Sequence, residues 1–292
     1  ADQVLGDDVV DEAAGPAGGV DFLDFRETQT VGVTVDLSIT TQQTVHATNL
    51  RLTFTSGASV EYLAGGDRDD TLIGNGLDNA FIGGLGNDII RGGAGLNYLV
   101  ETREDVVGHE EDDFTLASTG ATTASLAIGA DSDALTDIQF VLLTAGSGNN
   151  TMDASQFNAT GGAVILHGGA GDDTLLGSYG NDALYGDDGD DVLYGNAGAD
   201  YLYGGAGEDT LSGAGSFDLL LGTDGNDWLE GGDDSDLYIF DQSFQQGSDT
   251  ITERRGGGAH DTLQGVGVAG IDVNLYLATP QIISANLTLT LN

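Results

Sequence analysis

The chain contains no cysteine and no lysine, and it has only two prolines and seven arginines among its 292 residues. The absence of cysteine excludes disulfide bonds and thiolate metal sites. The absence of a basic patch argues against nucleic acid and anionic membranes as partners. No apolar run approaches the roughly 20 residues of a membrane-spanning helix, so we expect no membrane insertion.

Motifs for common enzymatic chemistries are also missing. No serine lies in a GxSxG elbow, and a P-loop would need the absent lysine. The histidines are scattered singly, without an HExxH zinc motif, at His46, His109, His167 and His260. Paired acidic residues that could serve a glycosidase abound through composition alone, so no particular pair is informative. We therefore expect a protein that is not an enzyme.

Acidic residues are abundant, because 48 Asp and Glu give a formal charge of −41. Repulsion among these charges opposes a compact state, and a weakly hydrophobic chain of this charge would be disordered. A hydrophobic content of 39% and a strict repeat argue against disorder. We therefore expect a chain that folds when cations neutralise it. The 48 glycines leave little room for helices, and apolar alternation at 31–39 and 50–54 predicts strands.

A nonapeptide repeat dominates the sequence. Twelve nonapeptides begin with glycine and carry an apolar residue at position 8, four of them in residues 65–100 and eight in residues 168–239. Examples are GGLGNDIIR at 83–91 and GGAGDDTLL at 168–176. A fixed short period of this kind is typical of solenoid proteins.

Each position of the repeat has an expected role. Position 1 is always glycine, and positions 2 and 4 often are, so we expect all three to adopt φ > 0 and to point carbonyl oxygens inward. Position 6 is Asp in ten of the twelve repeats, and positions 7–9 form a short strand with position 8 facing inward. Two nonapeptides then make one coil of the solenoid. The predicted fold is all-β, a parallel β-roll or β-helix solenoid with calcium-binding turns.

Turns stacked one coil apart predict calcium sites. Carboxylates and carbonyls from both turns could supply the six to eight hard oxygen ligands, at about 2.3–2.6 Å, that Ca²⁺ prefers. Mg²⁺ suits such a cage poorly, because it demands tighter octahedral geometry. We expect several ions, roughly six or more in 168–239 and one or two in 65–100, because each needs two stacked turns.

The candidate ligands follow from these positions. The predicted stacked pairs are Asp70/Asp88, Asp173/Asp191, Asp191/Asp209, Asp209/Asp227, Asp182/Asp200, Asp200/Asp218 and Asp218/Asp236. The candidate turn carbonyls are those of Gly168, Ala170, Gly186, Asp188, Gly195, Ala197, Gly204 and Ala206. Weaker candidates are Asn79, Asn97, Asn150, Asp249 and Asp261. Turns whose position 4 is not glycine are less certain sites, namely those with Arg68, Leu77, Ser216 and Asp234.

These repeats resemble the haemolysin-type calcium-binding (RTX) nonapeptide family, with the pattern GGxGxDxUx in which U is a large apolar residue. The resemblance covers residues 65–100 and 168–239 directly. It implies a calcium-loaded β-roll, type I secretion in unfolded form and folding outside the cell. We therefore expect an extracellular or cell-surface location. No signal peptide is visible at Ala1, so we expect a removed leader or a secretion signal elsewhere.

Composition divides the remaining chain. We expect an acidic edge at 1–21, a β-strand cap or solenoid segment at 22–64, the first array at 65–100, and a β-rich insert at 101–167 that continues the solenoid. The second array follows at 168–239, and degenerate repeats occupy 240–292. The end of this tail, 270–292, echoes 32–54, with Gly270 corresponding to Gly32. This echo suggests one unit of a longer tandem chain or copies that stack head to tail.

Two functions are compatible with these features. The favoured one is a secreted calcium-binding structural module, such as a stalk, adhesin, surface-layer or filament building block. The alternative is a C-terminal folding and secretion region of an extracellular enzyme, for example a lipase, protease or polysaccharide-modifying enzyme. A catalytic domain upstream in the complete gene product would favour the alternative.

Overall fold

The structure is a computed structural model, and it describes residues 7–10, 21–26, 31–39, 41–45, 51–54, 60–103, 112–241, 247, 249–252, 261–266, 274–275 and 288–291. These residues form strands, turns and bends, and no helix among them could span a membrane. The chain divides into two units. Unit 1 is Ala1–Glu101 with Ser118–Leu142, and unit 2 is Thr102–Ala117 with Leu143–Asn292.

The described strands of unit 1 form two sheets of mainly parallel strands and a third, small sheet. One sheet has the order β2 (Asp21–Asp24), β6 (Val60–Ala64), β8 (Asn79–Ile82) and β10 (Asn97–Thr102). The other has the order β3 (Thr34–Asp36), β7 (Thr71–Ile73), β9 (Ile89–Arg91) and β13 (Asp131–Thr136), with β12 (Thr123–Ile128) antiparallel to β13. A separate small sheet joins β1 (Asp7–Val10), β5 (Arg51–Phe54) and β4 (Gln43–Thr44).

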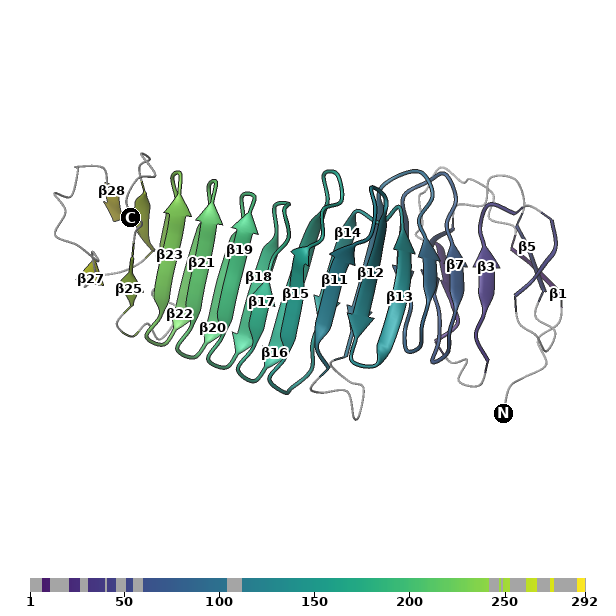
Figure 1. The fold of residues 1–292 in the computed structure, drawn as a ribbon, viewed down its shortest axis with the longest axis horizontal. Helices are drawn as coiled ribbons and strands as arrows, with labels where there is room; N and C mark the ends of the chain where they lie inside the picture. The colour runs from purple at the N-terminus through teal and green to yellow at the C-terminus, as the bar shows by residue number, and fades with distance from the viewer. Residues whose placement is uncertain are drawn as a thin grey trace. The chain divides into compact units, whose positions relative to one another are not determined.

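Unit 2 contains two sheets of parallel strands, whose members stand side by side in Figure 1. The first has the order β16 (Ala163–Ala170), β18 (Ala183–Asp188), β20 (Tyr201–Ala206), β22 (Leu219–Asp224), β24 (Leu237–Asp241), β26 (Thr262–Val266) and β28 (Thr288–Leu291). The second has the order β11 (Phe114–Ser118), β15 (Thr151–Gln156), β17 (Thr174–Leu176), β19 (Val192–Ala197), β21 (Thr210–Gly215), β23 (Trp228–Asp233), β25 (Thr250–Ile251) and β27 (Asn274–Leu275). The short strand β14 (Phe140–Thr144) spans the boundary between the units.

Within the second array, the strand register in both sheets of unit 2 matches the predicted coil length. Leu175 lies opposite Leu193 and Leu193 opposite Leu211, so partners are two nonapeptides apart. All twelve position-8 side chains are buried, with at most 1% of their surface exposed. Each buried side chain of this size contributes roughly 1.5–3 kcal/mol to folding. The predicted all-β fold of parallel strands is therefore confirmed.

The insert at 101–167 departs from the simple repeat. The insert is β-rich as expected, because its apolar segments 124–128, 138–143 and 163–166 overlap strands β12, β14 and β16. In unit 1, β13 extends the sheet of β9 in parallel and places Leu135 opposite Ile90, whereas β12 turns back antiparallel. Most of the sequence echo in 270–292, residues 1–6 and 11–20 of the acidic edge, and residues 104–111 of the insert lie outside the described residues.

Candidate metal sites in the repeat turns

Position-6 side chains stack in columns along the turns, where a column is a set of turns that follow one another at intervals of one coil. The backbone N–H of Asp173 donates to Asp191 Oδ1 at 2.8 Å, and the N–H of Asp191 donates to Asp209 Oδ1 at 2.9 Å. The same bond joins every predicted stacked pair, including Asp70 with Asp88 and Asn79 with Asn97. All ten position-6 aspartates are at most 3% exposed. The predicted stacking of these carboxylates is therefore confirmed, and their role as metal ligands stays a prediction.

The second carboxylate oxygen of most of these aspartates has no hydrogen-bond partner. This oxygen, Oδ2, is buried and unpaired at Asp88, Asp173, Asp191, Asp200, Asp209, Asp218, Asp227 and Asp236. A buried ionised carboxylate is strongly unfavourable unless a proton or a cation compensates it. Eight such oxygens, all at position 6 of their nonapeptides, therefore indicate sites that a positive charge would stabilise.

Position-1 glycines line the space that these oxygens face. A Cβ placed on Gly168 would lie 2.4 Å from Asp173 Oδ2 and 2.7 Å from the carbonyl oxygen of Gly186, the position-1 glycine of the next turn. We call this oxygen-bordered volume the position-1 space. It recurs, with an unpaired Oδ2 and a next-turn carbonyl, at five glycines of unit 2: Gly168, Gly186, Gly195, Gly204 and Gly213.

This geometry corrects the explanation for glycine at position 1. None of the twelve position-1 glycines, all of which are described, has φ > 0, so that prediction is wrong. They are glycine because a side chain would fill the space beside the carboxylate. Positive φ occurs at positions 2 and 4, as at Gly84 and Gly86. Ser216 and Asp234 keep this conformation at position 4, with φ of 84° and 77°.

The turns form two classes. In nine of the twelve, positions 2 and 4 both have positive φ, and we call these open turns. The other three are closed turns, in which the position-2 N–H donates to the position-6 side chain: Gly66 to Asp70 at 2.6 Å, Asn75 to Asn79 at 3.0 Å and Ser178 to Asp182 at 2.5 Å. All eight unpaired Oδ2 atoms belong to open turns. Each closed turn is the first nonapeptide of its column.

Asn97 provides a control within the molecule, because it is an amide in an open turn. Its Nδ2 lies 3.1 Å from the carbonyl oxygen of Asp137 and 3.4 and 3.5 Å from those of Gly93 and Gly95. The N–H donors of this amide therefore satisfy the inward carbonyls without a metal ion. Asn79 similarly donates from Nδ2 to the carbonyl of Val60 at 3.1 Å.

Burial and mutual repulsion perturb the carboxylates. Desolvation raises the pKa of Asp209 and of Asp88 to about 8, and that of Asp173 to about 7, with neighbouring aspartates adding to the rise. The pKa of Asp182 is raised by desolvation as well, although bonds from Val164 and Ser178 oppose the rise. These groups resist ionisation until a positive charge is close.

The donor set fits a hard oxygen-binding cation. No three Asp, Glu, His or Cys side chains converge on one point among the described residues, so carbonyls would supply most ligands. Calcium accepts such mixtures of carbonyl and carboxylate oxygens. Among the predicted carbonyls, those of Gly186 and Gly204 border position-1 spaces of open turns, whereas that of Gly195 borders the space of the closed Gly177 turn. The carbonyls of Asp188 and Ala206 each accept a backbone N–H at 2.8 Å, from Gly171 and Gly189; the carbonyls of Gly168, Ala170 and Ala197 stay predicted ligands.

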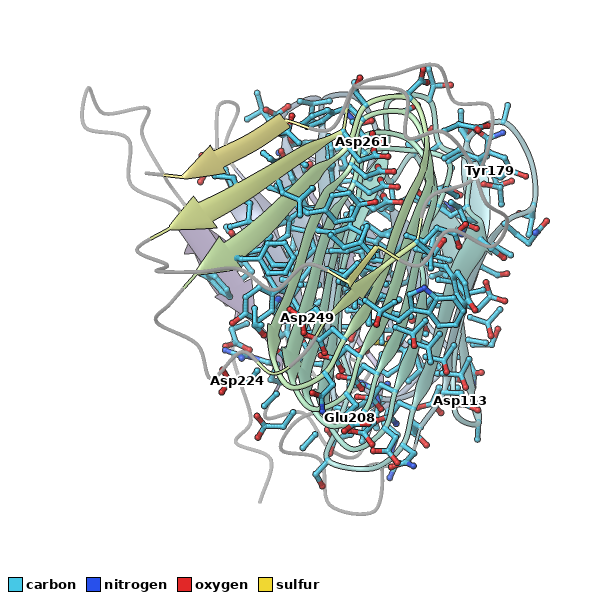
Figure 2. All side chains as sticks on the ribbon, turned by 90° about the vertical axis from the view of Figure 1, so that its left-hand side faces the viewer. Asp113, Tyr179, Glu208, Asp224, Asp249 and Asp261 are labelled. Carbon is cyan, nitrogen blue, oxygen red and sulfur yellow. The ribbon has the colours of Figure 1, made fainter. Side chains whose placement is uncertain are left out.

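The weaker candidates lie at the ends of the columns. Asp249 Oδ1 accepts the N–H of Asp227, and Asp261 Oδ1 accepts that of Asp236, each at 3.1 Å. In Figure 2, Asp113, Glu208 and Asp224 lie toward the lower part of the view, and Tyr179 and Asp261 toward the upper part. At the other end of the column that contains Asp173, the N–H of Asn150 donates to Asp173 Oδ1 at 2.7 Å.

Two buried acidic residues lie outside the predicted set of ligands. Asp133 Oδ1 accepts the N–H of Asp88 at 2.9 Å and so continues its column. The sequence did contain a signal for Asp133, because Asp133 precedes the buried Leu135 with one residue between them, as position 6 precedes position 8 in a nonapeptide. Glu101 is the other, and its position follows the first array directly.

A family model for the RTX calcium-binding nonapeptide repeat matches the chain in four copies, at residues 64–99, 156–184, 176–211 and 212–242. The matched segments cover both arrays except residue 100, and the match confirms the resemblance seen in the motifs. No curated protein matches the chain.

Proposed function

The repeats of this chain belong to the RTX calcium-binding nonapeptide family, and on that premise we propose that it is a secreted, non-enzymatic structural module that folds on binding calcium. Binding would occur at the open turns, where an unpaired Asp Oδ2 and the carbonyl of the next turn border one space. Calcium, when bound, supplies the positive charge that stabilises the ionised carboxylates. Because the unfolded chain lacks these spaces, binding energy becomes folding energy.

The eight unpaired Oδ2 atoms carry this proposal. Five of them, in unit 2, border a position-1 space together with a next-turn carbonyl, so we propose at least five calcium ions there. The closed turns and the Asn97 turn satisfy their own polar groups and would bind none.

Equilibrium dialysis against calcium and against magnesium tests the proposal. We expect five or more calcium ions per chain from the five spaces of unit 2. Magnesium at the same free concentration should bind in far smaller number, because it holds its water and requires tight octahedral geometry. Equal stoichiometry for the two ions would contradict a calcium-specific site.

We also propose that copies of the chain, or units of a longer tandem chain, associate end to end. The sequence echo between residues 32–54 and 270–292 supports this proposal. Open edge strands favour such pairing. Light scattering in saturating calcium should show species larger than the monomer, whereas a strict monomer at all concentrations would contradict self-assembly.

A further inference from the structure

A carboxylate replaces the repeat glycine at the end of the first array. Glu101 stands two nonapeptides after Gly83, at the place where the next turn of this column would have its position-1 glycine. The Glu101 side chain is buried, with 1% of its surface exposed. Its Oε1 accepts the N–H of Gly83 at 2.5 Å, and its Oε2 accepts the N–H of Gly84 at 3.3 Å. The side chain therefore turns back into the preceding turn.

The unpaired oxygen of Asp88 faces the same space. Asp88 is 1% exposed, and its Oδ2 has no hydrogen-bond partner. A Cβ placed on Gly83 would lie 2.5 Å from Asp88 Oδ2 and 3.0 Å from Glu101 Oε1, so both oxygens border the position-1 space of this turn. In the second array the corresponding place is taken by a carbonyl, as by that of Gly186 beside Asp173. Glu101 thus presents a carboxyl oxygen where the repeat presents a backbone carbonyl oxygen.

We propose that Asp88 Oδ2 and Glu101 Oε1 together hold a calcium ion that closes the first array. Both carboxylates lie within 3.0 Å of one buried point, where mutual repulsion and desolvation oppose their joint ionisation. A hard divalent cation relieves both effects and accepts carboxylate oxygens as ligands. The hydrogen bond from the Asp88 N–H to Asp133 Oδ1 fixes this turn against the following strand, β13. This proposal rests on the calcium function proposed above and adds a ligand outside the nonapeptide pattern.

The substitution Glu101→Gln tests the site, with Glu230→Gln as the matched control. Glu230 is half-buried at position 9 of its nonapeptide, in strand β23, and its substitution removes one acidic group, as Glu101→Gln does. In dialysis we expect Glu101→Gln to bind one calcium ion fewer than the wild type and Glu230→Gln to bind the full number. If both variants bind as many ions as the wild type with equal affinity, Glu101 is not a ligand and this proposal fails. Failure of the wild type to bind calcium would instead overturn the proposed function.

A crystal of the wild-type protein soaked with terbium keeps the proposal testable if Glu101→Gln does not fold. Terbium is a hard cation that takes oxygen ligands and gives a strong anomalous signal. We expect an anomalous peak between Asp88 Oδ2 and Glu101 Oε1 as well as at the position-1 spaces of Gly186 and Gly204. Peaks in the second array without one beside Glu101 would show that the two carboxylates share a proton instead, and would overturn this site alone.

Discussion

At the scale of single residues, the side chain at position 6 decides what a turn can hold. Asp and Asn occupy the same backbone place and make the same Oδ1 bond along the column. The other terminal atom of the side chain differs. In the open turns, Oδ2 of Asp accepts no hydrogen bond, whereas Nδ2 of Asn97 donates one to the carbonyl oxygen of Asp137. A single atom therefore separates a cation-requiring turn from a self-satisfied one.

Asp209→Asn should convert a turn that needs a cation into one whose polar groups are satisfied without a cation. The pKa of Asp209 is raised to about 8 by burial, so the amide removes an unfavourable charge from the calcium-free protein. In calcium at a hundredfold excess over Kd, loss of one site should lower the free energy of unfolding by about 2.7 kcal/mol. The measurement is urea unfolding with and without calcium.

The control for Asp209→Asn is Asp190→Asn. Asp190 is exposed, and its Oδ1 accepts the N–H of Glu208, a bond that an asparagine oxygen can keep. This variant should leave the calcium-dependent part of stability nearly unchanged. A similar calcium-dependent loss in both variants would mean that overall charge, rather than the buried Oδ2, governs the response.

Ser178→Ala should destabilise the protein equally at every calcium concentration that supports folding. Ser178 Oγ donates to both carboxylate oxygens of Asp182 at 3.0 Å, so this closed turn is satisfied without a cation. Loss of a buried hydrogen bond to a charged group costs about 1.5–3 kcal/mol. Ser125→Ala, on a half-buried strand position, is the control. If the loss vanished in high calcium, the Asp182 turn would be a cation site after all.

At the scale of the turn and strand, left-handed backbone at positions 2 and 4 distinguishes open from closed turns. Several open turns reach it without glycine, including Ala214 with φ of 80° and Thr223 with φ of 84°. Side chains in this region raise the energy of the backbone, more so when β-branched. Thr223 partly compensates, since its Oγ1 contacts both the N–H and the carbonyl oxygen of Gly205.

Ala214→Gly should stabilise the folded protein. Ala214 is exposed and has positive φ, so glycine relieves backbone strain without loss of buried surface. We expect a gain of roughly 0.5 kcal/mol after the greater entropy of the unfolded glycine is subtracted. Ala206→Gly, at an exposed position without positive φ, should lose roughly 0.5–1 kcal/mol. Thermal unfolding in calcium would measure both, and equal signs would contradict the assigned turn conformations.

Much of the element pattern could be predicted from sequence, because position 8 and position 6 have strong local signals. The buried side chains from Leu72 to Tyr238 and the stacked aspartates follow directly from the period. The closed turns could be predicted only in part, because Arg68 and Leu77 at position 4 mark two of them, whereas the third has Gly180 and the open turns include Ser216 and Asp234. All three closed turns are the first nonapeptides of their columns, which is a tertiary feature. The open Gly168 turn, also the first of the twelve in its column, is preceded there by the turn at Asn150. The antiparallel direction of strand β12 could not be predicted, because its segment contains no repeat.

At the scale of the whole molecule, columns of perturbed carboxylates couple folding to pH. The folded-state pKa is raised from 3.8 to about 6 at Asp191 and Asp236 and to about 8 at Asp209 and Asp218. The calcium-free folded state therefore binds protons more readily than the unfolded chain. Its stability is greatest below the ordinary pKa and is lost as the pH rises through 6 to 8.

Calcium-free protein should accordingly gain folded structure when the pH falls from 8 to 5. With calcium the direction reverses, because protons compete with the ion for the same oxygens and weaken its binding. The single tryptophan, Trp228, offers a fluorescence signal in metal-stripped buffer, to be compared with circular dichroism. A calcium-free protein that loses structure on this acidification would contradict the assigned pKa directions.

The central claim is that calcium supplies the free energy that folds this chain, which carries a charge of −41. Far-ultraviolet circular dichroism at neutral pH tests it most directly, with one sample in calcium, one in magnesium and one in EDTA. We predict a β spectrum in calcium, an unfolded spectrum in EDTA that regains β structure when calcium is restored, and little recovery in magnesium. A β spectrum that persists unchanged in EDTA would contradict the claim.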